Sequence, residues 1–211
     1  MPGKKSNRGH LKGLLSAAWG KKTPNILLGV SGGVAAYKAV DLASKLTGAS
    51  AKVNTIMTEN ACQLICPKSF EAVTGQPVYT NMWQADEQFK IGHVSIADWA
   101  DIVVVAPATA NIIGKIANGI CDDLLSTTLC VCWPLIKSGA ALLAPAMNSN
   151  MWDNPAVQRN IEIVTNMGFH LIGPEEGRLA CGTEGIGRMS EPQDILKAIE
   201  EIASKIKNRK R

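Results

Sequence analysis

The chain has 211 residues, of which 46% are hydrophobic, and this suits a single α/β domain with a sizeable core. No run of about 18 apolar residues occurs, so no membrane-spanning segment is predicted. The formal net charge is +4, but the basic excess lies at the two ends of the chain, which disfavours a nucleic-acid-binding surface on the folded body.

The sequence divides into three segments. Residues 1–24 are basic without an acid and are expected to form a disordered leader, residues 25–207 form the predicted domain, and residues 208–211 form a basic tail. The apolar stretch from Leu11 to Trp19 is too short and too interrupted for a signal peptide, which predicts a cytoplasmic protein.

The cysteines and histidines do not have the spacing of a metal site. The six cysteines form no paired CxxC motifs, and only three histidines accompany them, so no metal is predicted. In a reducing compartment we expect the cysteines to be mostly buried as small hydrophobic residues.

Short apolar runs alternate with helical patterns from residue 25 onward. Asn25–Val30 and Ala51–Met57 are predicted strands joined by a helix, and such a crossover implies a parallel pair. Further strands are predicted at Asp101–Ala106 and Ala140–Ala144, each ending in a Pro-containing turn, and at Phe169–Ile172.

Helices are predicted at 36–46, 58–66, 94–100, 109–118, 122–136 and 153–167, followed by a closing helix that begins at Pro192. The closing helix carries isoleucines on one face, at Ile195, Ile199, Ile202 and Ile206. The predicted fold class is α/β, a single doubly wound, Rossmann-like parallel sheet with helices on both faces.

Ligands of open parallel sheets bind beyond the carboxyl ends of the strands, where three turns qualify: Ser31–Val34, Pro107–Asn111 and Pro145–Trp152. The glycine-rich first turn could present N–H groups to a phosphate, or it could be only a tight strand-to-helix turn. Thr109 could likewise cap the following helix or bind a ligand. Because the first turn is not GxGxxG, a mononucleotide is favoured over a dinucleotide.

Five motifs in collinear order between about residues 24 and 195 resemble one known family. They are SGG (Ser31–Gly33), GHVSIADWAD (Gly92–Asp101), APATAN (Ala106–Asn111), PAMNSNMW (Pro145–Trp152) and ACGTEGIGRM (Ala180–Met189). Together they resemble the homo-oligomeric flavin-containing cysteine decarboxylases. The most similar members form the decarboxylase part of the bacterial bifunctional flavoprotein of coenzyme A biosynthesis.

This resemblance implies FMN as the cofactor, held at a subunit interface of a homo-oligomer, either a trimer or a dodecamer of trimers. The family pattern assigns FMN contacts to Ser31, Gly32, Gly33, Thr58, Pro107, Ala108, Thr109, Ala110 and Ala144. No metal, nucleic acid or membrane partner is implied.

The resemblance also implies the catalytic and substrate-binding residues. His93 is the expected base, and Cys181, on a glycine-rich flap over residues 177–187, is the expected late proton donor. Asn148, Met151 and Arg188 are expected to bind the substrate.

The activity implied is FMN-dependent decarboxylation of 4′-phosphopantothenoylcysteine to 4′-phosphopantetheine and CO₂ through a thioaldehyde and an enethiolate. Alternatives on the same fold are a peptidyl-cysteine decarboxylase, a flavin prenyltransferase, a flavin reductase or a phosphatase-binding regulatory subunit. Within the family, Cys181 favours an enzyme that reduces the enethiolate to a saturated product.

Overall fold

The structure is a computed structural model that describes residues 23–83 and 92–209. Most of the predicted leader, and residues 210–211 of the predicted tail, lie outside the described residues. The predicted boundary between domain and tail falls inside the closing helix, which continues to Arg209.

One parallel sheet organises the described chain, with the strand order β3-β2-β1-β4-β5-β6. Its strands are β1 (Asn25–Val30), β2 (Lys52–Met57), β3 (Val78–Tyr79), β4 (Ile102–Ala108), β5 (Ala141–Pro145) and β6 (Phe169–Leu171). The strand order reverses between β1 and β4, which are neighbours with Leu28 opposite Val104. The predicted doubly wound fold is therefore confirmed.

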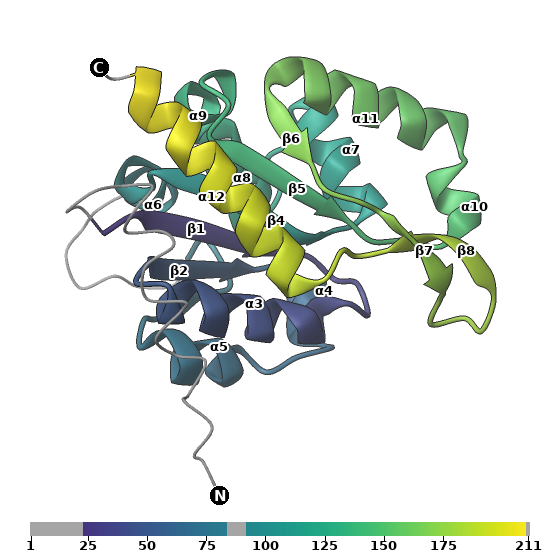
Figure 1. The fold of residues 1–211 in the computed structure, drawn as a ribbon, viewed down its shortest axis with the longest axis horizontal. Helices are drawn as coiled ribbons and strands as arrows, with labels where there is room; N and C mark the ends of the chain where they lie inside the picture. The colour runs from purple at the N-terminus through teal and green to yellow at the C-terminus, as the bar shows by residue number, and fades with distance from the viewer. Residues whose placement is uncertain (1–22, 84–91, 210–211) are drawn as a thin grey trace, which may run out of the picture.

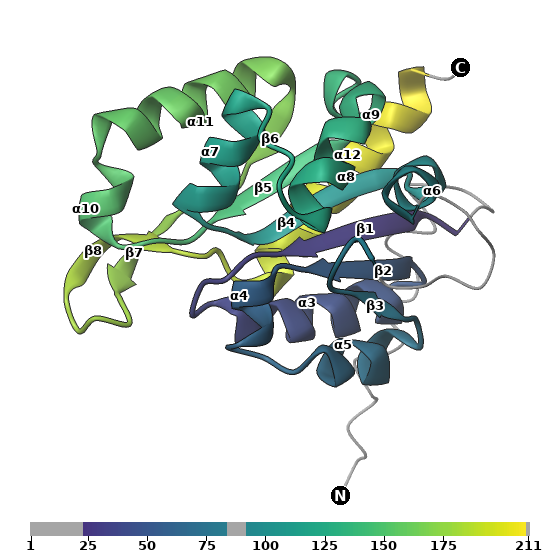
Figure 2. The same cartoon turned by 180° about the vertical axis from the view of Figure 1, so that it is seen from behind.

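Helices cover both faces of this sheet (Figures 1 and 2). They are α3 (Ala36–Gly48), α4 (Glu59–Cys62), α5 (Pro67–Thr74), α6 (Gly92–Trp99), α7 (Ala110–Asn118), α8 (Leu124–Val131), α9 (Trp133–Lys137), α10 (Ser149–Trp152), α11 (Pro155–Met167) and α12 (Pro192–Arg209). A hairpin of β7 (Glu175–Arg178) and β8 (Glu184–Arg188) projects beyond the carboxyl ends of the strands (Figure 1).

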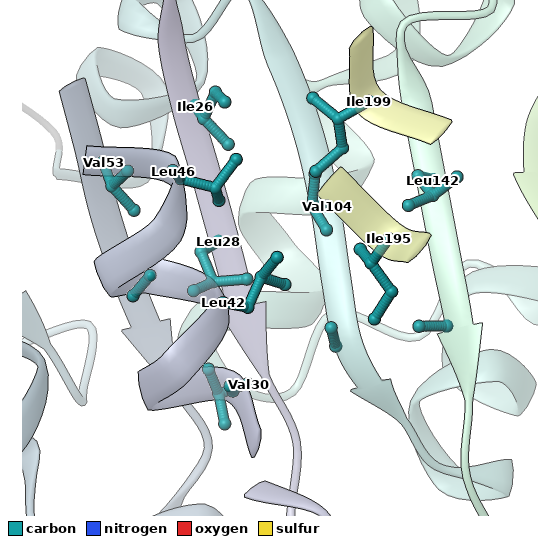
Figure 3. Packing of buried hydrophobic residues seen from close by; sticks show 14 of the residues in the cluster. Ile26, Leu28, Val30, Leu42, Leu46, Val53, Val104, Leu142, Ile195 and Ile199 are labelled. Atoms are coloured by element: carbon teal, nitrogen blue, oxygen red, sulfur yellow. The ribbon is translucent and has the colours of Figure 1, made fainter. Parts of the chain in front are cut away.

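The strands β1, β2, β4 and β5 contribute to two cores because successive side chains point to opposite faces. Ile26 and Leu28 belong to the first core, in which Leu42 of α3 lies beside Leu28 and Ile195 of α12 lies over β4 (Figure 3). Leu27 lies in the second core, with residues of α6, α7 and α8. The double burial explains why β1, β4 and β5 read as nearly continuous apolar runs.

The helix predicted over 122–136 is two helices, α8 and α9, which meet at Cys132. Pro134 lacks the N–H that would continue α8, but it is tolerated in the first turn of α9. The helix predicted over 58–66 is likewise only the four-residue α4, and Pro67 begins the next helix.

Several elements were not predicted: α5, the two-residue strand β3, α10 and the β7–β8 hairpin. The predicted turn after β4 also begins later, because the strand continues through Pro107 to Ala108. Its pairing with β5 shifts register between Val105 and Ala108, around a proline that has no N–H to donate.

The expectation that the cysteines are mostly buried is wrong, since only Cys132 is buried and most of the others are exposed. No group of three or more metal-binding side chains occurs among residues 23–83 and 92–209. Within the same ranges no helix is long and apolar enough to cross a membrane.

Candidate functional site

A cavity of about 1220 Å³ lies at the carboxyl ends of the central strands. It is lined by the turn after β1, the first residues of α4 and α7, the loop after β5, the β7–β8 hairpin and the start of α12. Its position at the point where the strand order reverses is where doubly wound sheets bind ligands. Its volume slightly exceeds that of most small-molecule sites, about 300–1,000 Å³, so it has room for a cofactor and a substrate together.

The hydroxyl of Ser31 ties the two central turns together. Ser31 Oγ donates to the carbonyl oxygen of Pro107 (2.7 Å), lies 3.1 Å from Thr109 Oγ1, and accepts from Thr109 N–H (3.0 Å). Thr109 also caps α7 by accepting from the N–H of Ile112. The capping role of Thr109 is thus confirmed, and the same residue faces the cavity.

The turn Ser31–Val34 is compatible with both of its predicted roles, a tight strand-to-helix turn and a site for a phosphate. A Cβ on Gly32 would stand 2.4 Å from Cβ of Asn60, so close packing against α4 requires glycine there. Among the described residues, the N–H groups of Gly32 and Val34 have no acceptor. Bare N–H groups at the start of α3 suit an anion, and Thr58, the N-cap of α4, lines the same cavity. The turn therefore fits the phosphate of the expected FMN.

Asn148 connects the loop after β5 to the hairpin. Its Oδ1 accepts from the N–H of Asn150 (2.9 Å), which caps α10, and its Nδ2 donates to Cys181 Sγ (3.4 Å). The main chain reinforces this connection, because Met147 N–H donates to the carbonyl oxygen of Gly187 (3.0 Å).

Cys181 lies in the loop between β7 and β8, and its side chain is exposed to the cavity. Thr183 Oγ1 stands 3.1 Å from its Sγ. Hydrogen bonds from Thr183, and to a smaller extent from Asn148, lower the pKa of the Cys181 thiol below its ordinary value. A more acidic thiol gives up its proton more readily.

The cavity brings together most of the predicted site residues. Those that line it are Ser31, Gly32, Gly33, Thr58, Thr109, Asn148, Met151, Cys181 and Arg188. Pro107, Ala108 and Ala144 are buried in the sheet beneath, and Ala110 lies in the first turn of α7. His93 is half-buried in the first turn of α6 and does not line the cavity of this chain.

Sequence reasoning missed a charged cluster in the lining. Lys115 contacts Asp122 (2.7 Å) and Asp123 (2.6 Å). Partial burial lowers the pKa of Lys115, but its bonds to the two carboxylates outweigh this and raise the pKa overall. The two adjacent aspartates before α8 could have been noticed in the sequence. Their pairing with Lys115, which lies eight residues before Asp123, could not be inferred from the sequence.

A second omission is the basic side chains near the hairpin, Lys38 and Arg178, which also line the cavity. Both lie outside the recognised motifs. Only the folded chain brings the surface of α3 next to the hairpin.

Comparisons with known proteins were consistent with one another. The family model described as Flavoprotein matches residues 16–204. The coenzyme A biosynthesis bifunctional protein CoaBC of Bacillus subtilis (strain 168) is 50% identical over 177 residues, which cover 84% of this chain and 42% of that protein. The chain thus spans less than half the length of the curated relatives it matches.

Two solved structures share the fold. A mutant PPC decarboxylase, with a cysteine replaced by serine, complexed with pantothenoylaminoethenethiol, has a TM-score of 0.75 and 33% identity, over 85% of this chain and 98% of that one. The FMN-dependent cysteine decarboxylase SpaF has a TM-score of 0.71 and 30% identity, over 86% of this chain and 97% of that one.

Proposed function

Because the chain belongs to the flavoprotein family, we propose that it is an FMN-dependent decarboxylase that converts 4′-phosphopantothenoylcysteine to 4′-phosphopantetheine and CO₂. Similarity to a coenzyme A biosynthesis protein and to a PPC decarboxylase supports this substrate. The observation that carries the proposal is the contact between Asn148 and Cys181 in a cavity that also contains the Ser31–Thr109 turn pair.

FMN fits the inner part of the cavity. The free N–H groups of Gly32 and Val34 would receive its phosphate, with the Thr58 and Thr109 hydroxyls nearby. Pro107, Ala108, Ala110 and Ala144 would form the floor beneath the ring. When bound, FMN supplies the two-electron acceptor and donor that this decarboxylation requires.

The loop after β5 and the hairpin would handle the substrate. The amide of Asn148, which donates to a thiol in this structure, would donate to the substrate carboxylate and orient it. Met151, with 46% of its surface exposed, is available to pack over the reacting carbon. Arg188 would contribute positive charge beside the substrate.

Cys181 would deliver the proton that completes the product. Its position in the hairpin loop places the thiol next to Asn148, and the hydroxyl of Thr183 stabilises the thiolate left behind. A hairpin that closes over the substrate would also keep water from a reactive thioaldehyde.

The base would come from a second copy of the chain. Because His93 does not line the cavity of its own chain, an assembly in which α6 of one copy approaches the cavity of the next would complete the site. The proposal therefore includes a homo-oligomer, built from trimers. It also includes a location in the cytoplasm, where we expect this enzyme to act. An imidazole can accept and release a proton, which suits it to proton abstraction.

A peptidyl-cysteine decarboxylase is the second candidate, since SpaF is an FMN-dependent cysteine decarboxylase of the same fold. The two candidate enzymes differ in whether their product is saturated or an enethiol. A thiol poised to donate a proton is needed to form a saturated product and is not needed if the reaction stops at an enethiol. Cys181 therefore favours the first candidate.

Mass spectrometry of the products tests the proposal. Purified protein loaded with FMN should release CO₂ from 4′-phosphopantothenoylcysteine and yield 4′-phosphopantetheine, whereas Cys181→Ser should accumulate the ethenethiol. Turnover of a peptide with a C-terminal cysteine, but not of 4′-phosphopantothenoylcysteine, would replace the first candidate by the second. Turnover of neither would overturn the proposal.

A further inference from the structure

Three basic side chains, from α3 and from the two strands of the hairpin, line the cavity. They are Lys38, Arg178 and Arg188, and Glu191, which precedes α12, lines the cavity with them. We call these four residues the basic corner. The three cations and one carboxylate give it a net charge of +2 (3 − 1).

Glu191 holds two of the cations in place. Lys38 Nζ lies 2.7 Å from Glu191 Oε1 and also donates to the carbonyl oxygen of Met189 (3.4 Å), and only 14% of the Lys38 side chain is exposed. Arg188 Nη2 lies 3.2 Å from the same carboxylate oxygen, while the rest of its guanidinium lies over Gly177. These side chains are already ordered before a ligand arrives, which reduces the entropy lost on binding.

Arg178 is different, because its side chain has no hydrogen bond or ion pair with any residue of the described ranges, although its main chain pairs within the hairpin. Glu184 stands opposite it in the hairpin register, but no ion pair joins them. Asp41, the acid of α3 that lines the cavity, pairs with Lys45 (2.6 Å). One guanidinium is therefore left available to a ligand in the cavity.

We propose that the basic corner binds a phosphate monoester, with Arg178 as its free donor. A phosphate monoester near neutral pH carries close to two negative charges, which matches the net charge of the corner. The planar fork of arginine can make two parallel hydrogen bonds to phosphate oxygens.

The substrate of the proposed function carries such a phosphate, and the inference that this is the one bound rests on that function. FMN also carries a phosphate, but the free N–H groups of Gly32 and Val34 already offer it a separate place at the start of α3. The basic corner would then recognise the end of the substrate remote from the cysteine and select phosphorylated over unphosphorylated substrate.

Arg178 is the residue to change, since replacing Lys38 or Arg188 would also disturb Glu191 and the start of α12. Arg178→Gln removes the charge and keeps a polar side chain on the strand. Arg159→Gln is the matched control, because Arg159 is exposed on α11 and does not line the cavity. Two quantities are measured: kcat/KM for 4′-phosphopantothenoylcysteine and for pantothenoylcysteine, and Kd for FMN and for riboflavin.

We expect Arg178→Gln to lower kcat/KM for the phosphorylated substrate by about tenfold to a hundredfold, as for a lost charge-assisted hydrogen bond. Its kcat/KM for pantothenoylcysteine and its Kd for FMN should not change, and Arg159→Gln should behave like the wild type.

If the preference for FMN over riboflavin falls instead, the phosphate bound is that of the cofactor. If neither preference changes, the proposal is wrong, while turnover by the variant leaves the proposed function intact. A wild-type protein that turns over neither substrate contradicts the proposed function, and the FMN measurements then test the basic corner alone.

Discussion

The side-chain amide of Asn148 donates to the thiol of Cys181 over 3.4 Å, although 33 residues separate them in the sequence. Asn148 ends the loop after β5, and Cys181 sits at the tip of the hairpin that follows the sheet. The same asparagine caps α10 through its other amide atom. One side chain therefore both caps a helix and contacts the thiol that we propose to be catalytic.

Replacing Asn148 should separate these two roles. Asn148→Ala and Asn154→Ala each remove an N-cap that accepts from the N–H two residues on, at 2.9 Å in both cases. Each should lose about 0.5–2 kcal/mol of stability in urea unfolding. Only Asn148→Ala should also reduce kcat, because Asn154 does not line the cavity. Equal kcat losses in both variants would show that the contact with Cys181 has no catalytic role.

Thr183 should control the acidity of Cys181. Since the hydrogen bond from Thr183 is the main cause of the lowered pKa, Thr183→Val should raise the pKa, and Thr183→Ser should restore it. The rate of alkylation of Cys181 by iodoacetamide, measured against pH in a variant lacking the other exposed cysteines, reports this pKa directly. A midpoint for the valine variant that matches the wild type would contradict the assignment.

Gly187 should be intolerant of a side chain. A Cβ there would stand 2.1 Å from the carbonyl oxygen of Met147, and the φ of +156° disfavours other residues. Gly187→Ala should cost about 1–3 kcal/mol from backbone strain alone and should reduce turnover by pushing the hairpin away from the loop that holds Asn148.

Gly182→Ala is the comparison for that change. Gly182 has a φ of +89° in the same hairpin, but nothing lies within 4 Å of its added Cβ. It shares the backbone strain and lacks the clash. If the two variants lose the same stability in urea unfolding and the same turnover, the close approach to Met147 is unimportant.

Mixing inactive variants should restore activity if His93 acts in a neighbouring copy. His93→Asn and Cys181→Ser should each fail to form the saturated product while retaining FMN. After dissociation and reassembly of an equal mixture, about a quarter of the sites formed between random neighbours should contain both native residues. Absence of any recovered 4′-phosphopantetheine from a reassembled oligomer would place both residues in the same chain's site.

The central strands β1, β4 and β5 could be predicted because each is buried on both faces and reads as a nearly unbroken apolar run. The division of 122–136 into two helices could have been predicted from Pro134, which was present in the sequence and given too little weight. The hairpin could not, because β7 (Glu175–Arg178) is polar and short and has no core face to impose a pattern.

Most residues that line the candidate site could be named from the sequence because they follow strands or lie in recognised motifs. Thr183 and Arg178 were not predicted. We single out Thr183 for its contact with the Cys181 thiol, and Arg178 because its side chain has no partner in the described residues. Neither feature can be inferred from residue spacing or composition. The role of His93 stays a prediction, since it depends on a neighbouring chain.

Whether FMN binds in the cavity decides the account as a whole, and the visible absorbance spectrum of the purified protein tests it directly. Apoprotein titrated with FMN and passed through a desalting column should retain flavin absorbance at one FMN per chain. Ser31→Ala should retain less, because it loses the hydroxyl that joins the two turns. A wild-type protein that emerges colourless after exposure to excess FMN would contradict the central claim.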